Sequence, residues 1–580
     1  MPAIAVAAVV GVLFFLGYRY YSAFLAERIY ALDPAFLTPA HEFKDGIDFV
    51  PTNKHVVFGH HFTSVAGAAP IVGPAIAVFW GWGPALAWIV LGTIFAAGVH
   101  DLGSLAVSLR HRAKNIGTIA QDVISKRART LFLLIIFFLL TLVNAVFAVV
   151  IASLFVANPG AVIPIFVEIP LAMFIGQYIY KTRSAALVPS ILGVIGLYLL
   201  IWVGQQYPID IASVADAFGM EPRTLWVIIL FVYTFVASRL PVWMLLQPRD
   251  YINSHQLFIA LGVIGLGMLV GWNEIVAPLV NDVPADSPSI FPFLFITIAC
   301  GAISGFHSLV SSGTTAKQVD KETDARYIGY MGAVGEGSLA TGAVLAATAG
   351  VVATRGEWDA LYPDFATASG GAVGNFVNGV AVFANNLGIP LDLAVIFAAV
   401  VVISFAATTM DTGVRLQRYI VQEIAELAGW HKLARNLTLA GLVAVAVPMA
   451  MALIPGGGDA GYTFGVLWRL FGTTNQLTAG LALTVVAVWV LRMKRNPLPA
   501  VIPLVFLLAM TTWALFSQFW DFTQGESWSE RWVLAPLDAG IFILAVWLIV
   551  EAVGALRRGS RREYDEAGSP VGDDSDATTQ

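Results

Sequence analysis

Several ionisable side chains lie inside stretches of this chain that are otherwise apolar. They are His60, His61, His100, Asp101, His307, Glu336 and Asp411. Imidazole changes its charge near neutral pH, so a histidine in such a place could bind a carboxylate or pass a proton, or could simply bond a neighbouring carbonyl. A carboxylate in an apolar helix is costly without a role, and Glu336, between two glycines, is the strongest candidate for a proton carrier.

Three apolar segments also carry helix-breaking clusters. The first runs from Gly59 to Pro70 and on to Gly73-Pro74, the second from Ala237 to Trp243, and the third from Gly301 to His307 and on to Thr315. Broken helices expose backbone groups at membrane depth, where half-helix N-termini favour anions and unwound carbonyls favour cations. The clusters therefore predict a binding site; the alternative is that small residues only permit kinks and close helix packing.

The candidate substrate contacts come from these clusters. They are His60, His61, Gly67, Ser238, Arg239, Ser304 and His307. Arg239 is the predicted fixed cation, because its planar fork matches a carboxylate in two hydrogen bonds. An arginine at that position could instead extend its long side chain to the membrane interface.

The candidates for ion or proton coupling form a second set. They are Ala66, His100, Asp101, Ser311, Ser312, Thr314, Thr315, Lys317, Glu336 and Asp411. The four hydroxyls could ligate a cation opposite the helix break at Ala66–Gly67, or they could cap a helix. Lys317 could serve as a fixed or titrating charge near them.

Helix geometry constrains the partners of the remaining polar residues. Neighbours on a helix point about 100° apart, so His100 and Asp101 should need partners from other helices. Asp411 is expected to pair with Arg415, four residues further on. Late in the chain, Asn475-Gln476 is predicted to join helices by hydrogen bonds.

The elements that position these residues must lie in a membrane. Apolar residues make up 58% of the chain and charged residues only 12%, against roughly 25% charged residues in a soluble domain. The single cysteine, Cys300, excludes an internal disulfide, and no basic stripe with interleaved aromatics indicates nucleic acid. Residues 2–17 are apolar without a preceding basic region, which predicts a first membrane helix rather than a cleaved signal peptide.

A membrane span needs roughly 20 apolar residues, and the chain predicts an all-α polytopic membrane protein with about fifteen spans. The expected spans lie near 2–24, 57–80, 83–109, 130–157, 160–180, 185–204, 224–246, 255–277, 291–311, 327–353, 390–410, 434–455, 473–492, 498–518 and 532–556. Segments 370–388 and 462–472 are Gly-rich or short and could be re-entrant or interfacial pieces.

Loop charges predict the orientation of the chain. Basic residues gather in the loops 110–129, 181–183, 317–326, 415–435 and 492–495, which should be cytoplasmic, whereas acidic residues gather in 210–221, 281–286 and 521–530. The N-terminus should then lie outside and the charged tail inside. The first two helix breaks fall in antiparallel spans five apart, as an inverted five-plus-five repeat requires.

This pattern predicts four regions. Residues 1–56 would form an N-terminal transmembrane helix and cytoplasmic loop, and 57–410 a transporter core with inverted repeats. Residues 411–556 would add further helices, and 557–580 a disordered cytoplasmic tail.

Motifs spread from the N-terminal region to Gln476 carry a resemblance to a known family. They include Leu32-Asp33-Pro34, Asp48-Phe49-Val50-Pro51-Thr52-Asn53-Lys54, Phe58-Gly59-His60-His61-Phe62, Val99-His100-Asp101, Leu240-Pro241-Val242-Trp243, Pro248-Arg249-Asp250-Tyr251, the run from Gly301 to Gln318, Glu336-Gly337, Thr408-Thr409-Met410-Asp411-Thr412-Gly413 and Asn475-Gln476. On these residues the chain resembles the carbon starvation protein A (CstA) family. The resemblance implies an inner-membrane carrier of the amino-acid/polyamine/organocation type, with proton coupling and uptake of pyruvate or peptides during carbon starvation. Similar carriers place a sodium site between the helices that correspond to the first and third breaks.

These observations together predict a secondary transporter rather than an enzyme. Its substrate would be a small carboxylate, pyruvate first and peptides second, driven by a proton or sodium gradient and bound between spans 57–80 and 224–246. No phosphate-loop or zinc-protease motif occurs, so neither a cofactor nor a metal is expected. The alternatives from other classes are a channel and an integral membrane enzyme whose histidines hold a metal.

Overall fold

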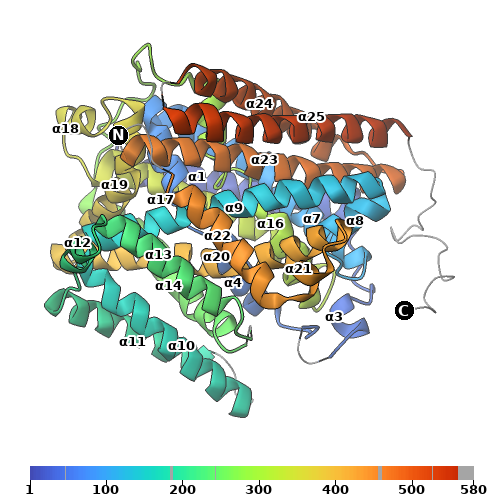
Figure 1. The fold of residues 1–580 in the computed structure, drawn as a ribbon, viewed down its shortest axis with the longest axis horizontal. Helices are drawn as coiled ribbons and strands as arrows, with labels where there is room; N and C mark the ends of the chain where they lie inside the picture. The colour runs from blue at the N-terminus through green and yellow to red at the C-terminus, as the bar shows by residue number, and fades with distance from the viewer. Residues whose placement is uncertain (46–47, 183–186, 242, 455–459, 526, 559–580) are drawn as a thin grey trace.

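A bundle of helices builds the molecule (Figure 1). The computed structural model describes residues 1–45, 48–182, 187–241, 243–454, 460–525 and 527–558. Regular structure in these ranges is helical, apart from two isolated β-bridges, Pro2 with Glu274 and Thr52 with Val319. The predicted all-helical class is therefore confirmed for the described residues.

Ten helices in the described residues are long and apolar enough to cross a membrane, or up to twelve spans if each of two bent pairs counts as one. The ten are Ala3–Ile29, Trp82–Arg110, Lys126–Ala157, Pro159–Thr182, Leu187–Gln206, Leu246–Gly271, Leu391–Leu427, Phe464–Arg492, Leu498–Gln524 and Glu530–Arg557. The bent pairs are Lys54–Val65 with Ala69–Trp80, at 51°, and Arg326–Gly350 with Arg355–Leu361, at 119°. The molecule is a polytopic membrane protein.

The expected fifteen spans are too many by this criterion, because three of them are short or broken. The expected spans 224–246 and 434–455 are the shorter helices α13 (Pro222–Ala237) and α22 (Leu437–Ala452). The expected span 291–311 is split into α15 (Ile290–Thr297) and α16 (Phe306–Gly313). Helix α13 ends where the apolar run meets Ser238, and the interruption between α15 and α16 contains Gly301 and Gly305.

Two expected re-entrant pieces are instead parts of continuous helices. Segment 370–388 lies in α19 (Phe365–Asn386), a helix of 22 residues that packs against α5 (Ala69–Ala77), α14 (Leu246–Gly271) and α23 (Ala460–Arg492). Segment 462–472 belongs to α23 itself. Burial between neighbours stabilises these Gly-rich sequences as helices, which local composition does not reveal. Most of the predicted disordered tail, 559–580, lies outside the described residues.

Two long helices form the centre of the bundle. Helix α9 (Lys126–Ala157) begins where the Ser125 side chain accepts a hydrogen bond from the Ala128 N–H, and it ends before Pro159, which disfavours a further helical residue. It packs against α20 (Leu391–Leu427), α23 and α22. Helix α23 is the most enclosed span, with 94% of its apolar window buried.

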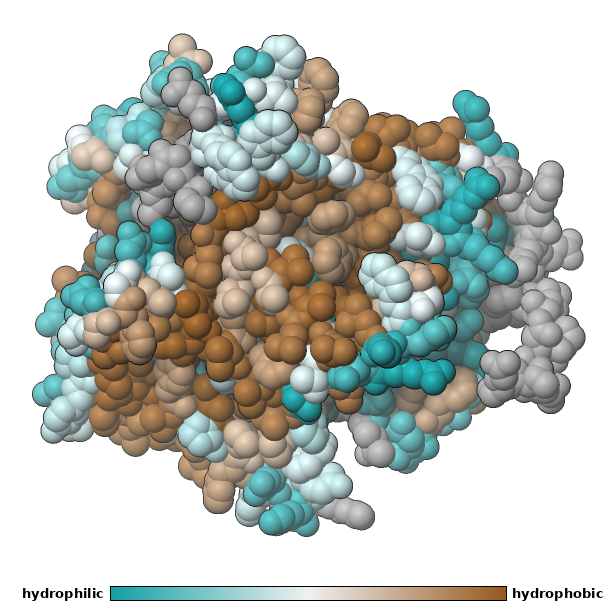
Figure 2. All heavy atoms as spheres, viewed as in Figure 1, coloured by the Kyte–Doolittle hydropathy of each residue, from teal (hydrophilic) through white to brown (hydrophobic). Residues whose placement is uncertain are grey.

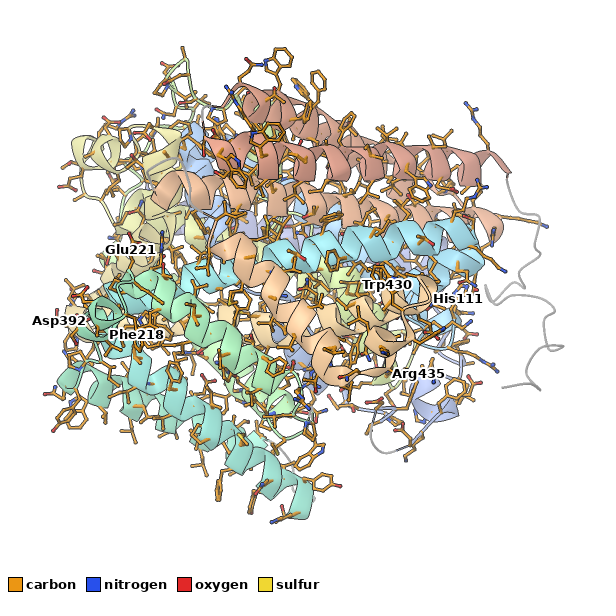
Figure 3. All side chains as sticks on the ribbon, viewed as in Figure 1. His111, Phe218, Glu221, Asp392, Trp430 and Arg435 are labelled. Carbon is orange, nitrogen blue, oxygen red and sulfur yellow. The ribbon has the colours of Figure 1, made fainter. Side chains whose placement is uncertain are left out.

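The surface shows the two polar ends expected of a membrane protein. Figure 2 shows apolar side chains over the middle of one face and hydrophilic ones gathered at the right-hand end. In Figure 3, Glu221 and Asp392 lie at the left-hand end, whereas His111 and Arg435 lie at the right. The basic loops meet at one end: Arg492 bonds the Val123 carbonyl, and Arg129 pairs with Glu423 at 3.3 Å.

Candidate functional site

Two imidazoles and two carboxylates meet in the interior of the bundle. His100 and Asp101 lie on α7 (Gly98–Arg110), His307 on α16 and Glu336 on α17 (Met331–Leu345), and all four side chains are buried. Asp101 lies between the two imidazoles, with one oxygen 2.7 Å from His100 Nδ1 and the other 2.8 Å from His307 Nδ1. The other ring nitrogen of His307, Nε2, is 3.3 Å from Glu336 Oε2. We call these four residues the imidazole–carboxylate cluster.

The break between α15 and α16 places His307 in this cluster. Gly301 adopts a φ of 94°, in the left-handed region that favours glycine, and its Cα faces Ala340 of α17. Asn475 of α23 accepts hydrogen bonds from the Phe306 N–H, at 3.2 Å, and from the Ser304 hydroxyl, at 3.3 Å. This contact satisfies the start of α16 and fixes the turn that carries His307. The predicted helix-joining role of Asn475 is confirmed, and Gln476 likewise donates to the Phe295 carbonyl.

Neighbouring histidines on α4 (Lys54–Val65) face different partners. His61 is buried with Nδ1 2.9 Å from Thr315 Oγ1, and its Nε2 faces Gly332, one helical turn before Glu336 on the same helix. It lies close enough to interact electrostatically with Asp101 and His307. His60 points the other way, with Nδ1 3.4 Å from Asp250 Oδ2. Helix α4 therefore lies between the imidazole–carboxylate cluster and a second polar group.

That second group surrounds a buried arginine. Arg249 of α14 donates through Nη1 to Asp411 Oδ2 at 2.9 Å and to the Tyr233 hydroxyl at 3.1 Å. Its Nε lies 3.6 Å from Oε1 of Glu168 on α10 (Val162–Thr182). Tyr233 also donates to Asp411 Oδ2, at 2.8 Å. We call Glu168, Tyr233, Arg249 and Asp411 the arginine cluster.

This arrangement corrects the expected partner of Asp411. Its close ion-pair partner is Arg249 at 2.9 Å, from a helix distant in sequence. Arg415 instead donates to the backbone carbonyls of Ala237, at 3.0 Å, and Leu240, at 2.6 Å. The carbonyls exposed at the end of α13 attract that guanidinium more closely than the carboxylate one turn away.

The predicted cation Arg239 lies away from these clusters. It is exposed and stacks over Phe235, with its guanidinium carbon 5.7 Å from the ring centre. Ser238 is buried, but its hydroxyl bonds the Phe235 carbonyl of its own helix. Val242, in the same cluster of the sequence, lies outside the described residues.

The hydroxyl side chains at the end of α16 and directly after it have separate partners. Ser312 donates to the Ser308 carbonyl and accepts from the Ile116 N–H; Thr314 is exposed and donates to the Val310 carbonyl. Thr315 contacts His61, and only Ser311 Oγ is buried without a hydrogen-bond partner in the described chain. Lys317 lies 3.8 Å from Asp48 and stacks on Phe49, in the loop region. Among these side chains, Thr315 alone contacts one of the predicted substrate-binding histidines, His61.

The first helix break lies against α20, the helix that carries Asp411. Helix α4 ends at Val65, and the next residue, Ala66, is buried. A Cβ at Gly67 would come 2.7 Å from Thr409 Oγ1 on α20, two residues before Asp411. Helices α4 and α5 also pack against α16 and α15 respectively. The first and third breaks therefore meet, and α13, which leads into the second, packs against α9, α22 and α20.

Three residues of the arginine cluster, Glu168, Tyr233 and Arg249, were not among the residues predicted from the sequence. Arg249 lies in the first turn of α14, between the expected spans 224–246 and 255–277. Glu168 stands alone in an apolar run of α10. The available signal was the cost of an ionised side chain in an apolar segment, which should have singled out Glu168. In the described ranges, no group of three or more His, Cys, Asp and Glu is placed to hold a metal ion.

Comparison with known proteins identifies the family. The family description "Carbon starvation protein CstA" matches residues 2–361 and 353–514. The chain belongs to this family. A peptide transporter CstA of Campylobacter jejuni is 33% identical to it, over 89% of this chain and 80% of the relative. The pyruvate/proton symporter BtsT of Escherichia coli is 31% identical, over 87% and 80%.

Membership of this CstA family makes the chain a secondary transporter and not an enzyme, as predicted. A solved manganese transporter mutant of Eremococcus coleocola aligns over 89% of this chain and 99% of its own, at 11% identity and a TM-score of 0.38.

Proposed function

We propose that this CstA-family transporter imports a small carboxylate, with pyruvate first, and that protons drive the uptake. The imidazole–carboxylate cluster carries the proposal. Two imidazoles and two carboxylates in direct contact, buried in a membrane protein, can gain and lose protons by redistributing them among neighbours. The position of His307 on α16 joins that titration to a broken span, the kind of element that moves in alternating access.

Pyruvate is proposed because it is small and anionic, and a relative of this chain is named for its transport with a proton. Peptide uptake is the second candidate, because the relative from Campylobacter jejuni is named a peptide transporter. Both substrates present a carboxylate to the protein. Protons are preferred to sodium as the coupling ion because three of the four predicted hydroxyl ligands already have other partners.

The proposed organisation keeps the predicted regions. Residues 57–410 act as a core of inverted repeats that rock against each other, 1–56 and 411–556 surround it, and the N-terminus lies outside. The first and third breaks, which pack together, supply the moving half-helices of the proposed site. Asn475 of α23 adds to this core from the later region, through its bonds to the third break.

Uptake into proteoliposomes tests the proposal. Labelled pyruvate should accumulate when the outside is acidic, and a protonophore should abolish the accumulation. A sodium gradient at equal pH should not replace the proton gradient. Accumulation of dipeptides without pyruvate would transfer the assignment to peptide uptake, and equilibration of pyruvate without accumulation under any gradient would indicate a channel.

A further inference from the structure

We infer that Arg249 binds the carboxylate of the transported substrate, and that Asp411 and Glu168 occupy its guanidinium when the substrate is absent. The inference rests on the proposed import of a carboxylate and adds the residue that recognises it. The arginine predicted from sequence, Arg239, is exposed, whereas Arg249 is entirely buried.

The guanidinium of Arg249 has one occupied side and one open edge. Nη1 is bonded to Asp411 and Tyr233. Nε and Nη2, which point along the other edge, are buried without a hydrogen-bond partner among the described residues. Glu168 faces Nε at 3.6 Å, which is too long for a hydrogen bond. Two adjacent N–H donors on one planar edge match the two oxygens of a carboxylate.

The carboxylates around this edge are also incompletely bonded. Oε1 of Glu168 and Oδ1 of Asp411 are both buried without a partner in the described chain. Ser404 donates to the other oxygen of Glu168, at 3.3 Å. One cation facing two carboxylates leaves an excess negative charge in a buried place, which is unfavourable unless a proton or another cation balances it.

Further charged groups lie near this edge on the surrounding helices. Asp250 follows Arg249 on α14 and contacts His60 of α4, and Arg415 lies on α20 one turn after Asp411. These groups do not bond the open edge of Arg249. Glu168 is thus the carboxylate that a substrate anion would displace from the open edge, and Asp411 is a negative charge that opposes the anion from the Nη1 side.

The location of Arg249 suits a substrate that is carried from one side of the membrane to the other. Thr408 of α20 accepts a hydrogen bond from Asn253 of α14 at 2.7 Å, and the next residue, Thr409, faces Gly67 in the break between α4 and α5. Helix α14 also packs against α4, and His60 of α4 lies 3.4 Å from Asp250, so a carboxylate on Arg249 would lie near the first broken span. Movement of that span would open or close the site.

Exchange of anions on Arg249 would require a proton. When the substrate carboxylate approaches, Asp411 or Glu168 takes up one proton on a carboxylate oxygen and releases its hold on the guanidinium. The substrate oxygens then accept the Nε–H and Nη2–H bonds. When the substrate leaves, the proton is lost and the internal ion pair re-forms, so one anion moves with one proton.

Two variants test the inference through opposite changes in the KM for pyruvate. Arg249→Lys keeps the charge but removes the fork, and we expect its KM in gradient-free exchange to rise by about tenfold or more. Asp411→Asn removes a negative charge that repels a substrate anion at Arg249, so its KM at pH 8 should fall below that of the unmodified protein and vary less with pH. A misfolded protein cannot produce the second result.

The outer helix α18 (Arg355–Leu361) supplies matched controls. Arg355 and Asp359 form an exposed pair at 2.7 Å, so Arg355→Lys and Asp359→Asn should leave the KM unchanged. If the unmodified protein accumulates pyruvate while both cluster variants keep its KM, the inference fails and the proposed function stands. If the unmodified protein accumulates no carboxylate, the proposed function and the inference fail together. An effect of Arg239→Lys instead of Arg249→Lys would assign recognition to the exposed arginine.

Discussion

At the scale of single residues, consecutive side chains on one helix serve two different groups. His61 faces Thr315 and α17, whereas His60 faces Asp250 of α14. Adjacent residues on a helix diverge by about 100°, so this division follows from helix geometry. Helix geometry does not always separate neighbours, because the side chains of His100 and Asp101 meet at 2.7 Å although the two residues are adjacent. The outside partner that we expected for this pair is His307.

Glu336→Gln should separate substrate exchange from proton-driven accumulation. The amide keeps the size of the side chain but cannot carry a negative charge opposite His307. We expect the initial rate of pH-driven uptake to fall by about a hundredfold, the lower end of what a positioned proton-transfer group contributes. Pyruvate exchange without a gradient should remain measurable.

The matched control for this variant is Glu357→Gln, on exposed α18. Its uptake should equal that of the unmodified protein. Uptake by the Glu336 variant at an unchanged rate would remove Glu336 from the proposed proton path.

At the scale of elements, interrupted helices position the candidate site. The turn between α15 and α16 is held by Asn475, and the end of α13 by Arg415. Each interruption leaves backbone groups that a polar side chain from another helix satisfies. The breaks are therefore ordered features of the bundle and not merely weak points in a span.

Gly305→Ala should destabilise the turn before α16. A Cβ at this position would overlap the backbone oxygen of Asn475 and lie 2.5 Å from the backbone nitrogen of Ala479. Because backbone atoms of α23 cannot move aside without shifting the helix, we expect a loss of about 1–3 kcal/mol. A lower midpoint of thermal unfolding in detergent would show it.

Gly265→Ala provides the comparison in α14. No atom lies within 4 Å of a Cβ there, and alanine is favoured over glycine in a helix by up to about 1 kcal/mol. This variant should unfold at the same temperature as the unmodified protein or higher. Equal destabilisation of both variants would show that close packing against α23 is not the cause.

At the scale of the whole molecule, one ion pair joins three distant segments at the end that carries the basic loops. Glu322 accepts hydrogen bonds from Arg110 at the end of α7 and, at 2.6 Å, from the Asp33 N–H. Arg110 also donates to the Ala31 carbonyl, at 3.2 Å. The contact ties the chain after the first helix to α7 and to the loop before α17.

Glu322→Ala should loosen this end. Removing one partner of a buried ion pair costs about 3–5 kcal/mol, and both Arg110 and Glu322 are buried. Hydrogen exchange should become faster in residues 31–33 and 320–325. Glu42→Ala breaks the more exposed pair with Arg112, at 3.2 Å, so it should change exchange much less. If hydrogen exchange in these residues were equally slow in Glu322→Ala and Glu42→Ala, the proposed role of the Arg110–Glu322 pair would be contradicted.

Labelling of single introduced cysteines should reveal the orientation. The only native cysteine, Cys300, is buried. With a membrane-impermeant maleimide on intact cells, Asp359→Cys should react, and Lys432→Cys should react only after the membrane is opened. The basic loops predict this result, because positive charge is retained in the cytoplasm. The reverse pattern would place the N-terminus inside.

The sequence alone determined that this protein is a helical membrane transporter of the CstA family. Because apolar residues make up 58% of the chain, its surface must face lipid. The family motifs extend along most of the chain. It also pointed to the ionisable residues of the imidazole–carboxylate cluster, since such residues are rare in apolar segments.

The tertiary structure decided which of these residues meet. Arg249 and Asp411 are 162 positions apart, and Asp101 and His307 are 206 apart, so no local pattern relates them. It also placed Arg239 at the surface and Arg249 in the interior, and it made the Gly-rich segments parts of continuous helices. The physical reason is that a buried charge is stabilised only by partners, and helix packing supplies those partners.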